Sequence, residues 1–171
     1  MYNLVAPCLF GLEKTVSYEL KNLGANDIKI TDGRVHFKGD DETIVKANIC
    51  LRTAQRVMIE LGQFKASTFE ELFQGIKAIN YSKYLKKDYK FTIAKAKSVS
   101  SKLTSIPTIQ SIAKKAMAER LKLLFDTDIL PESSNIGVPF NILIQKDVAS
   151  LYIDTTGASM HKRGYREKTV L

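Results

Sequence analysis

The chain has 171 residues, of which 44% are hydrophobic and 26% charged, and its formal net charge is +8. This composition is typical of a globular protein with its own core, and no apolar run approaches the roughly 20 residues of a membrane-spanning helix. The first residues carry no basic leader ahead of an apolar stretch, so we expect no signal peptide and no membrane partner. We therefore predict a cytoplasmic protein.

The positive charge is unevenly distributed along the chain. Residues 1–66 contain 9 Lys and Arg against 8 Asp and Glu, whereas residues 67–171 contain 17 against 10. The excess in the second part indicates a polyanionic partner, either nucleic acid or an anionic surface. Because many basic faces are only solvated, the net charge does not decide between these interpretations.

The residues that usually bind metals are scattered. Cys8, Cys50, His36 and His161 lie far apart, whereas a structural zinc site needs about four clustered ligands. We predict no metal site, and we interpret the cysteines as small buried hydrophobic residues.

Motifs of catalysis are also missing from the sequence. It contains no glycine-rich nucleotide loop, no nucleophile elbow and no cluster of metal ligands. Adjacent carboxylates such as Asp40-Asp41 and Glu70-Glu71 come at predicted helix starts, where capping and the helix dipole explain them. We predict no catalytic residue and no bound cofactor in this chain.

The first part of the chain predicts the order β-α-β-β-α-β. Strands are expected over residues 2–7 and around 28–30, 35–37 and 57–61, and helices are expected over 12–23 and from the cap at 40 to about 51. The Asp32-Gly33 pair is typical of a two-residue hairpin, Gly24 of a helix C-terminus and Asp40 of a helix N-cap. This order is the split βαβ of a ferredoxin-like fold, which we predict for residues 1–66.

The second part opens with a capping box, Ser67 or Thr68 followed three residues later by Glu70 or Glu71. A helix to about 79, a strand over 89–96, a long helix over 106–125 and strands over 138–144 and 149–154 follow. A tight turn is expected near Lys146-Asp147. We predict a second domain over 67–156 and a charged connector over 157–171, so the fold class is α+β.

The segment from 94 to 115, AKAKSVSSKLTSIPTIQSIAKK, places a loop dense in Lys and Ser before a helix with Pro107 in its first turn. Free backbone N–H groups and the helix dipole make such a position an anion site. The side chains predicted to contact phosphates here are Lys95, Lys97, Ser98, Ser101, Lys102, Thr104 and Ser105. The alternative interpretation is that the hydroxyls cap the helix and the lysines are solvated.

Two further groups of residues are candidates for the same surface. Lys114 and Lys115 lie beyond the first turn of the long helix and extend a basic track, unless they are ordinary surface lysines. The motif HKRGYR offers arginines for bidentate phosphate contacts and a tyrosine for base stacking. Its candidate residues are Lys162, Arg163, Tyr165 and Arg166; a linker pinned to a neighbouring domain is the alternative.

These motifs also resemble a known family. KAKSVSSKLTSIPTIQSIAKKA, the strand pair ending in LYIDTTG and the terminal HKRGYR resemble the THUMP-containing RNA methyltransferases. The opening FGLEKTVSYELKNLGA is similar to the N-terminal helix of that family. The chain looks most like the bacterial branch that modifies guanine N2 in large-subunit ribosomal RNA, whose members have often been labelled DNA adenine methylases.

The resemblance implies a ferredoxin-like domain and a THUMP domain that together bind structured RNA, with rRNA as the expected partner. In the family, a following Rossmann-like methyltransferase domain binds S-adenosylmethionine and performs the transfer. This chain contains neither a glycine-rich cofactor loop nor an Asn/Asp-Pro-Pro-aromatic motif, so the resemblance implies part of a larger enzyme. The RNA-facing elements would be the Lys95–Lys102 loop and the helix with Lys114 and Lys115, and HKRGYR would lead to the methyltransferase domain.

Other classes of function remain open at this point. One is part of a DNA-directed methyltransferase, and another is a tRNA-modifying relative, because the THUMP domain serves several chemistries. A third is a non-enzymatic scaffold whose basic face binds an acidic protein.

Overall fold

The structure is a computed structural model that describes every residue except 132, 133, 135 and 163–171. The chain forms two compact units. The first unit contains Met1–Glu60 and the chain from Asp154 onward, and the second unit contains Leu61–Ile153. The predicted domain limits, 1–66, 67–156 and 157–171, stay predictions. The compact units differ from them in two ways: their boundary at Glu60 lies within a strand, and the chain after Ile153 belongs to the first unit again.

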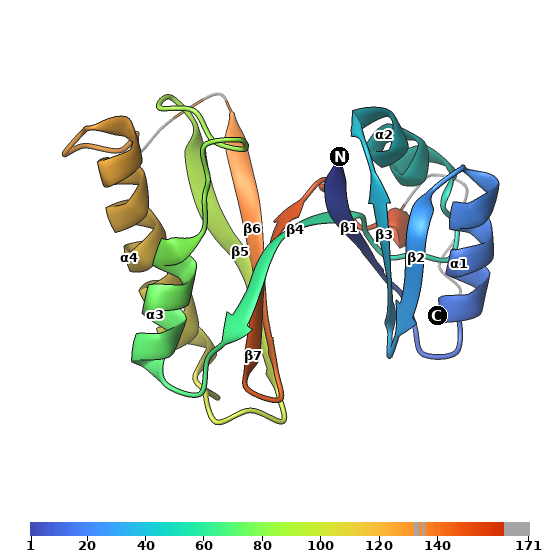
Figure 1. The fold of residues 1–171 in the computed structure, drawn as a ribbon, viewed down its shortest axis with the longest axis horizontal. Helices are drawn as coiled ribbons and strands as arrows, with labels where there is room; N and C mark the ends of the chain where they lie inside the picture. Colours follow the sequence, from blue (N-terminus) through green and yellow to red (C-terminus); the bar gives the residue numbers. More distant parts are fainter. Residues whose placement is uncertain (132–133, 135, 163–171) are drawn as a thin grey trace. The chain divides into compact units, whose positions relative to one another are not determined.

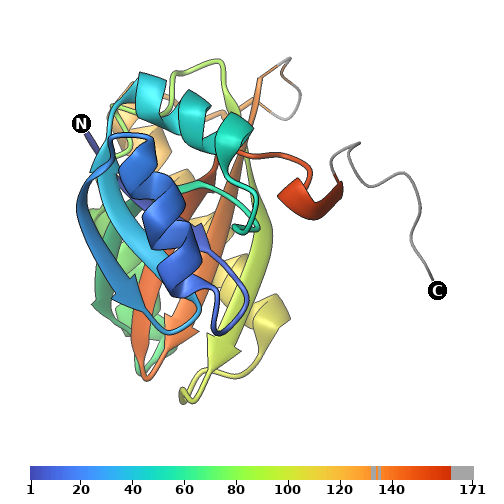
Figure 2. The same cartoon turned by 90° about the vertical axis from the view of Figure 1, so that its right-hand side faces the viewer.

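The first unit has the predicted element order and an antiparallel sheet. Its elements are β1 (Tyr2–Pro7), α1 (Glu13–Asn22), β2 (Asn26–Thr31), β3 (Arg34–Gly39), α2 (Asp41–Cys50) and the start of β4 (Met58–Lys65). The strand order is β2-β3-β1-β4, and β1 is antiparallel to both of its neighbours. Figures 1 and 2 show α1 and α2 on the same face of these strands. The predicted ferredoxin-like fold is therefore confirmed.

Local signals explain where the helices of this unit begin and end. The Asp40 carboxylate accepts a hydrogen bond from the Thr43 backbone N–H at 2.9 Å, which caps α2. Gly24 follows α1 with a φ of +78°, a left-handed conformation that suits glycine after a helix. The apolar stripe of α1 buries Val16 and Leu20 completely. Both predicted helix boundaries thus have a local cause.

The chain returns to the first unit after β7 (Val148–Asp154) through a buried polar cluster. The Arg56 guanidinium pairs with the Asp154 carboxylate, and both side chains are mostly buried, 14% and 6% exposed. The same guanidinium donates to the Gly157 carbonyl and the Ser159 hydroxyl, each at 2.7 Å. Met160 is then buried in the first unit. Arg56 therefore holds the returning segment in place.

The second unit is a mixed sheet with two helices. Besides the end of β4 and β7, it contains α3 (Phe69–Ala78), β5 (Lys90–Val99), α4 (Ile106–Phe125) and β6 (Gly137–Gln145). The strand order is β4-β7-β6-β5, in which β5 is parallel to β6 and β6 is antiparallel to β7. Figure 1 shows α3 and α4 on one side of these strands. Strand β5 lies at the edge of the order.

The predicted signals of the second unit are also present. The Thr68 side chain and the Glu71 side chain form the reciprocal capping box at the start of α3. Lys146 and Asp147 have positive φ values of 51° and 59°, as a two-residue hairpin of type I′ requires. The Tyr81 ring meets the Phe140 ring edge-on at 6.2 Å, and both side chains are fully buried.

A bulge in β5 decides which side chains face the helices. Ile93 is opposite Phe140 and Lys95 is opposite Asn141, so Ala94 is an extra residue without a partner. Phe140 lies on the helix side, because its ring contacts Tyr81, whose hydroxyl donates to the Ile76 carbonyl in α3.

Strict alternation from Ile93 would direct Lys95 and Lys97 toward the helices. The extra residue reverses this direction. Lys95 is opposite Asn141 and Lys97 is opposite Leu143, and both partners alternate with Phe140, so the two lysines lie on the face opposite the helices. Ala96 and Ser98 take the helix side instead. The bulge thus allows an apolar edge strand to carry two exposed lysines.

We predict that Arg56→Ala lowers the free energy of unfolding by about 3 kcal/mol, because it leaves the buried Asp154 carboxylate without its cation. The matched control Arg52→Ala removes an exposed arginine and is expected to change stability by less than about 0.5 kcal/mol. Urea denaturation of both variants measures the difference. Similar small losses for the two variants would show that the Arg56 cluster does not hold the returning segment.

Candidate nucleic-acid interface

The loop between β5 and α4 is fixed by the β6–β7 turn. The Lys146 backbone N–H donates to the Val99 carbonyl at 3.2 Å, and the Lys102 backbone N–H donates to an Asp147 carboxylate oxygen at 2.7 Å. Ser100 takes a positive φ of 49° inside the loop. The backbone of the predicted anion site is therefore held by residues more than 40 positions away in the sequence.

Two of the predicted hydroxyl donors are used within this loop. The Ser98 hydroxyl donates to the Leu103 carbonyl. The Ser101 hydroxyl donates to the Val99 carbonyl at 2.9 Å and accepts from the Asp147 backbone N–H at 3.0 Å. A hydroxyl has one proton to donate, so these two serines build the loop instead of offering donors to a ligand.

The start of α4 has no side-chain cap. Ser105 is the N-cap residue, but its side chain makes no capping hydrogen bond and lies 2.7 Å from the Thr108 hydroxyl instead. Pro107 occupies the first turn, and the first backbone bond of the helix runs from the Ile109 N–H to the Ser105 carbonyl. Thr104 is exposed beside it. This helix start keeps the electrostatic character of an anion site.

The predicted lysines around this loop are exposed. Lys95, Lys97 and Lys102 form no ion pair within the described part of the chain. The turn adds Lys146, also exposed, which the sequence reasoning did not include. A tight-turn prediction alone does not indicate that the turn lies against the loop.

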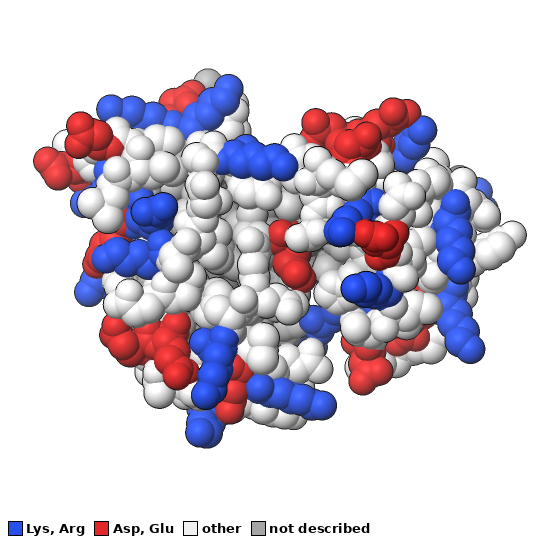
Figure 3. All heavy atoms as spheres, viewed as in Figure 1, with Lys and Arg blue, Asp and Glu red and all other residues white. Residues whose placement is uncertain are grey.

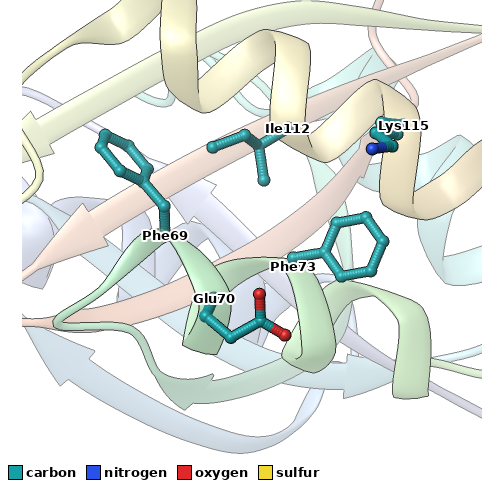
Figure 4. A pocket seen from close by; sticks show the side chains of 5 residues that line it. All are labelled: Phe69, Glu70, Phe73, Ile112 and Lys115. Atoms are coloured by element: carbon teal, nitrogen blue, oxygen red, sulfur yellow. The ribbon is translucent and has the colours of Figure 1, made fainter.

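Lys114 and Lys115 lie elsewhere, on the outer surface of α4. Lys115 lines an open groove of about 270 Å³ between α3 and α4, together with Phe69, Glu70, Phe73 and Ile112 (Figure 4). Its ammonium group lies 6.0 Å from the centre of the Phe73 ring. The groove therefore mixes aromatic, basic and acidic side chains. These lysines are on the helix side of the sheet, whereas Lys95 and Lys97 are on the opposite side.

The last predicted group is only partly described. Lys162 is exposed at the end of a short 3₁₀ helix, Met160–Lys162, and its backbone N–H donates to the Ser159 carbonyl at 2.9 Å. Arg163, Tyr165 and Arg166 lie outside the described residues. Their predicted RNA contacts stay predictions.

On the face shown in Figure 3, basic and acidic side chains are interspersed over the second unit. Among the described residues, no group of three or more His, Cys, Asp or Glu side chains could hold a metal ion. No helix in the described ranges is long and apolar enough to cross a bilayer.

Comparison with known proteins agrees with this architecture. Residues 3–58 match the RlmL ferredoxin-like domain, and residues 66–154 match the THUMP domain. The two units thus define a ferredoxin-like domain followed by a THUMP domain. The chain belongs to the THUMP-domain family.

Relatives that match nearly the whole of this chain are named as methyltransferases. "Putative RNA methyltransferase YpsC" of Bacillus subtilis (strain 168) is 40% identical over 96% of this chain and 43% of its own length. SMU.472, described as "a putative methyltransferase complexed with SAH", is 47% identical, with a TM-score of 0.90 over 98% of this chain and 45% of that protein.

A third relative is described as a DNA methylase. It is a "predicted N6-adenine-specific DNA methylase" from Listeria monocytogenes str. 4b F2365, and it is 42% identical, with a TM-score of 0.91 over 99% of this chain and 44% of that protein. This chain spans less than half of the length of each of these relatives.

We predict that Ser101→Ala lowers the free energy of unfolding by about 1–2 kcal/mol, because both hydrogen bonds of its hydroxyl are lost. Thr104→Ala, in the same loop, is expected to leave stability unchanged, since its side chain is exposed. Thermal unfolding of the two variants tests this assignment. An equal effect on stability would remove the distinction between structural and available hydroxyls.

Proposed function

We propose that this chain is the N-terminal, RNA-binding portion of an S-adenosylmethionine-dependent RNA methyltransferase. The observation that carries the proposal is a THUMP domain in which exposed Lys95 and Lys97 lie on β5 and exposed Lys102 lies in the loop between β5 and the uncapped start of α4. Lysines and helix N-termini are common phosphate contacts in nucleic-acid complexes. The relatives named as methyltransferases support the enzyme class, and the SAH in one of them supports the cofactor.

In this proposal the chain docks RNA and the chemistry takes place in a Rossmann-like domain that follows in the same polypeptide. The relatives are more than twice as long as this chain, which leaves room for such a domain. The substrate we propose is a guanine N2 in structured ribosomal RNA, and the setting is the cytoplasm. The chain would hold A-form RNA through phosphates and shape, because side chains read the bases of its deep major groove poorly.

The second candidate is a DNA-directed methyltransferase, which the name of the Listeria relative favours. Competition between an RNA hairpin and a DNA duplex of the same sequence and length separates the two candidates. Preference for the hairpin supports the RNA proposal, and preference for the duplex overturns it. A tRNA-modifying role predicts tighter binding of a tRNA than of an rRNA helix.

We predict that the chain binds a fluorescently labelled RNA hairpin with an affinity that falls steeply with salt, by a slope of about 0.9 for each phosphate neutralised. Lys102→Glu should weaken this binding about tenfold at 0.1 M salt and lower the slope by about 1. The control Lys122→Glu changes the same charge on the last turn of α4 and is expected to leave binding unchanged. No binding by the unmodified chain at low salt would contradict the proposed function.

A further inference from the structure

A second basic cluster lies at the other end of β5. Residues 80–90, NYSKYLKKDYK, contain four lysines and a single acidic residue, Asp88, interleaved with tyrosines. We call this stretch the Tyr–Lys segment. Basic residues interleaved with aromatic ones are a common composition of surfaces that bind single-stranded nucleic acid, and none of the residues predicted from the sequence falls in this segment.

The Tyr–Lys segment is anchored to the second unit at two points. Tyr81 is fully buried and its hydroxyl donates to the Ile76 carbonyl at 2.8 Å, while Leu85 is only 3% exposed. The Leu85 backbone N–H donates to the Tyr81 carbonyl at 3.0 Å, which closes a turn between the anchors. The lysines between and after these anchors are therefore displayed from a fixed backbone.

Two exposed lysines of the segment lie beside the half-buried rings of Tyr84 and Tyr89. Lys83 lies 5.8 Å from the centre of the Tyr84 ring and Lys86 lies 6.0 Å from the centre of the Tyr89 ring. These distances are near the outer limit of a cation–π contact, so the contacts are weak. A phosphate can therefore replace the ring as the partner of the ammonium group, and the ring can then stack on a base.

Strand β5 connects the Tyr–Lys segment to the basic loop. On the face opposite the helices, Lys90 is opposite Gly137 and Lys95 and Lys97 follow after the bulge. The strand has 10 residues, which at about 3.3 Å per residue separates the two clusters by roughly 30 Å. Lys95 and Lys97, on the same face as Lys90 at the end of the segment, therefore lie between the two clusters.

We propose that an RNA-binding track runs the length of β5, in which lysines contact phosphates and the rings of Tyr84 and Tyr89 stack on unpaired bases at the far end. The track rests on the proposed function, because it extends the same RNA contact beyond the loop at Lys102. Its ligand is a duplex that continues into a single strand. The groove between α3 and α4 is less suited to RNA, since Glu70 lines it beside Lys115.

Lysines on an edge strand also prevent edge-to-edge association of sheets, which is the alternative explanation for Lys95 and Lys97. That explanation does not extend to Lys86 and Lys87, which lie outside the strand. These two residues therefore decide between the two explanations.

The first test uses Lys86→Glu and Lys87→Glu in the full chain, with Lys122→Glu as the control of equal charge. An RNA hairpin with a single-stranded extension is titrated at several salt concentrations. Each segment variant should weaken binding about tenfold at 0.1 M salt and lower the salt slope by about 1, as expected for one phosphate contact. If Lys102→Glu weakens binding and the segment variants match the control, the track is wrong and the proposed function stands.

The second test concerns stacking and compares a blunt hairpin with the one that carries a single-stranded extension. Tyr84→Ala should weaken binding of the extended RNA about tenfold and leave the blunt hairpin unaffected, whereas Tyr84→Phe keeps the ring and should bind as the unmodified chain does. Equal losses on both RNAs, or no loss on either, would overturn stacking at this position. Failure of the unmodified chain to bind either RNA would instead overturn the proposed function.

Discussion

Ala94 is the one residue of β5 without a partner in β6, and the direction of every side chain beyond it depends on this bulge. With strict alternation, Lys95 and Lys97 would face α3 and α4, where burial of an unpaired ammonium group costs several kcal/mol. The extra residue turns both lysines outward and fills the helix side with Ala96 and Ser98. One face of the edge strand can therefore pack against the core while the other face is basic.

The two basic clusters at the ends of β5 share a second property, which is a backbone held in place by hydrogen bonds and buried side chains. The loop at Lys102 is bonded to the β6–β7 turn through Asp147, and the Tyr–Lys segment is anchored by Tyr81 and Leu85. Lysine side chains remain mobile, but their backbone positions are fixed. Such a surface suits recognition of the regular phosphate spacing of an RNA helix, which is largely independent of its sequence.

One buried ion pair lies at the point where the chain returns to the first unit. After β7, Asp154 pairs with Arg56, and Ser159 and Met160 follow into the first unit. Residues 154–162 thus belong to the ferredoxin-like unit, although the THUMP domain precedes them in the sequence.

The helices and strands were predictable because their signals are local. The capping box of Thr68 and Glu71, the turn at Lys146 and Asp147, and the apolar stripes of the helices each depend on residues a few positions apart. The ferredoxin-like order of residues 1–66 followed from helices and strands predicted in the same way. The bulge was not predictable, because alternation of apolar residues before Ala94 does not indicate where the register shifts.

The candidate site was predictable only in part, since its geometry depends on distant residues. Ser98 and Ser101 match the composition of a phosphate loop, yet their hydroxyls bond to the Leu103 and Val99 carbonyls. Ser101 also meets Asp147, 46 positions away, a contact that no local pattern indicates. The Tyr–Lys segment is different, because its interleaved composition is visible in the sequence. Only the structure shows that the segment leads into the strand that carries Lys95 and Lys97.

The most direct test of this account is to follow the backbone amide signals of the isotopically labelled chain by NMR as an RNA hairpin with a single-stranded extension is added. The account predicts that the largest shifts fall on the Tyr–Lys segment, on the Lys95–Lys97 face of β5 and on the loop at Lys102. Shifts confined to α1, α2 or the groove between α3 and α4 would contradict it.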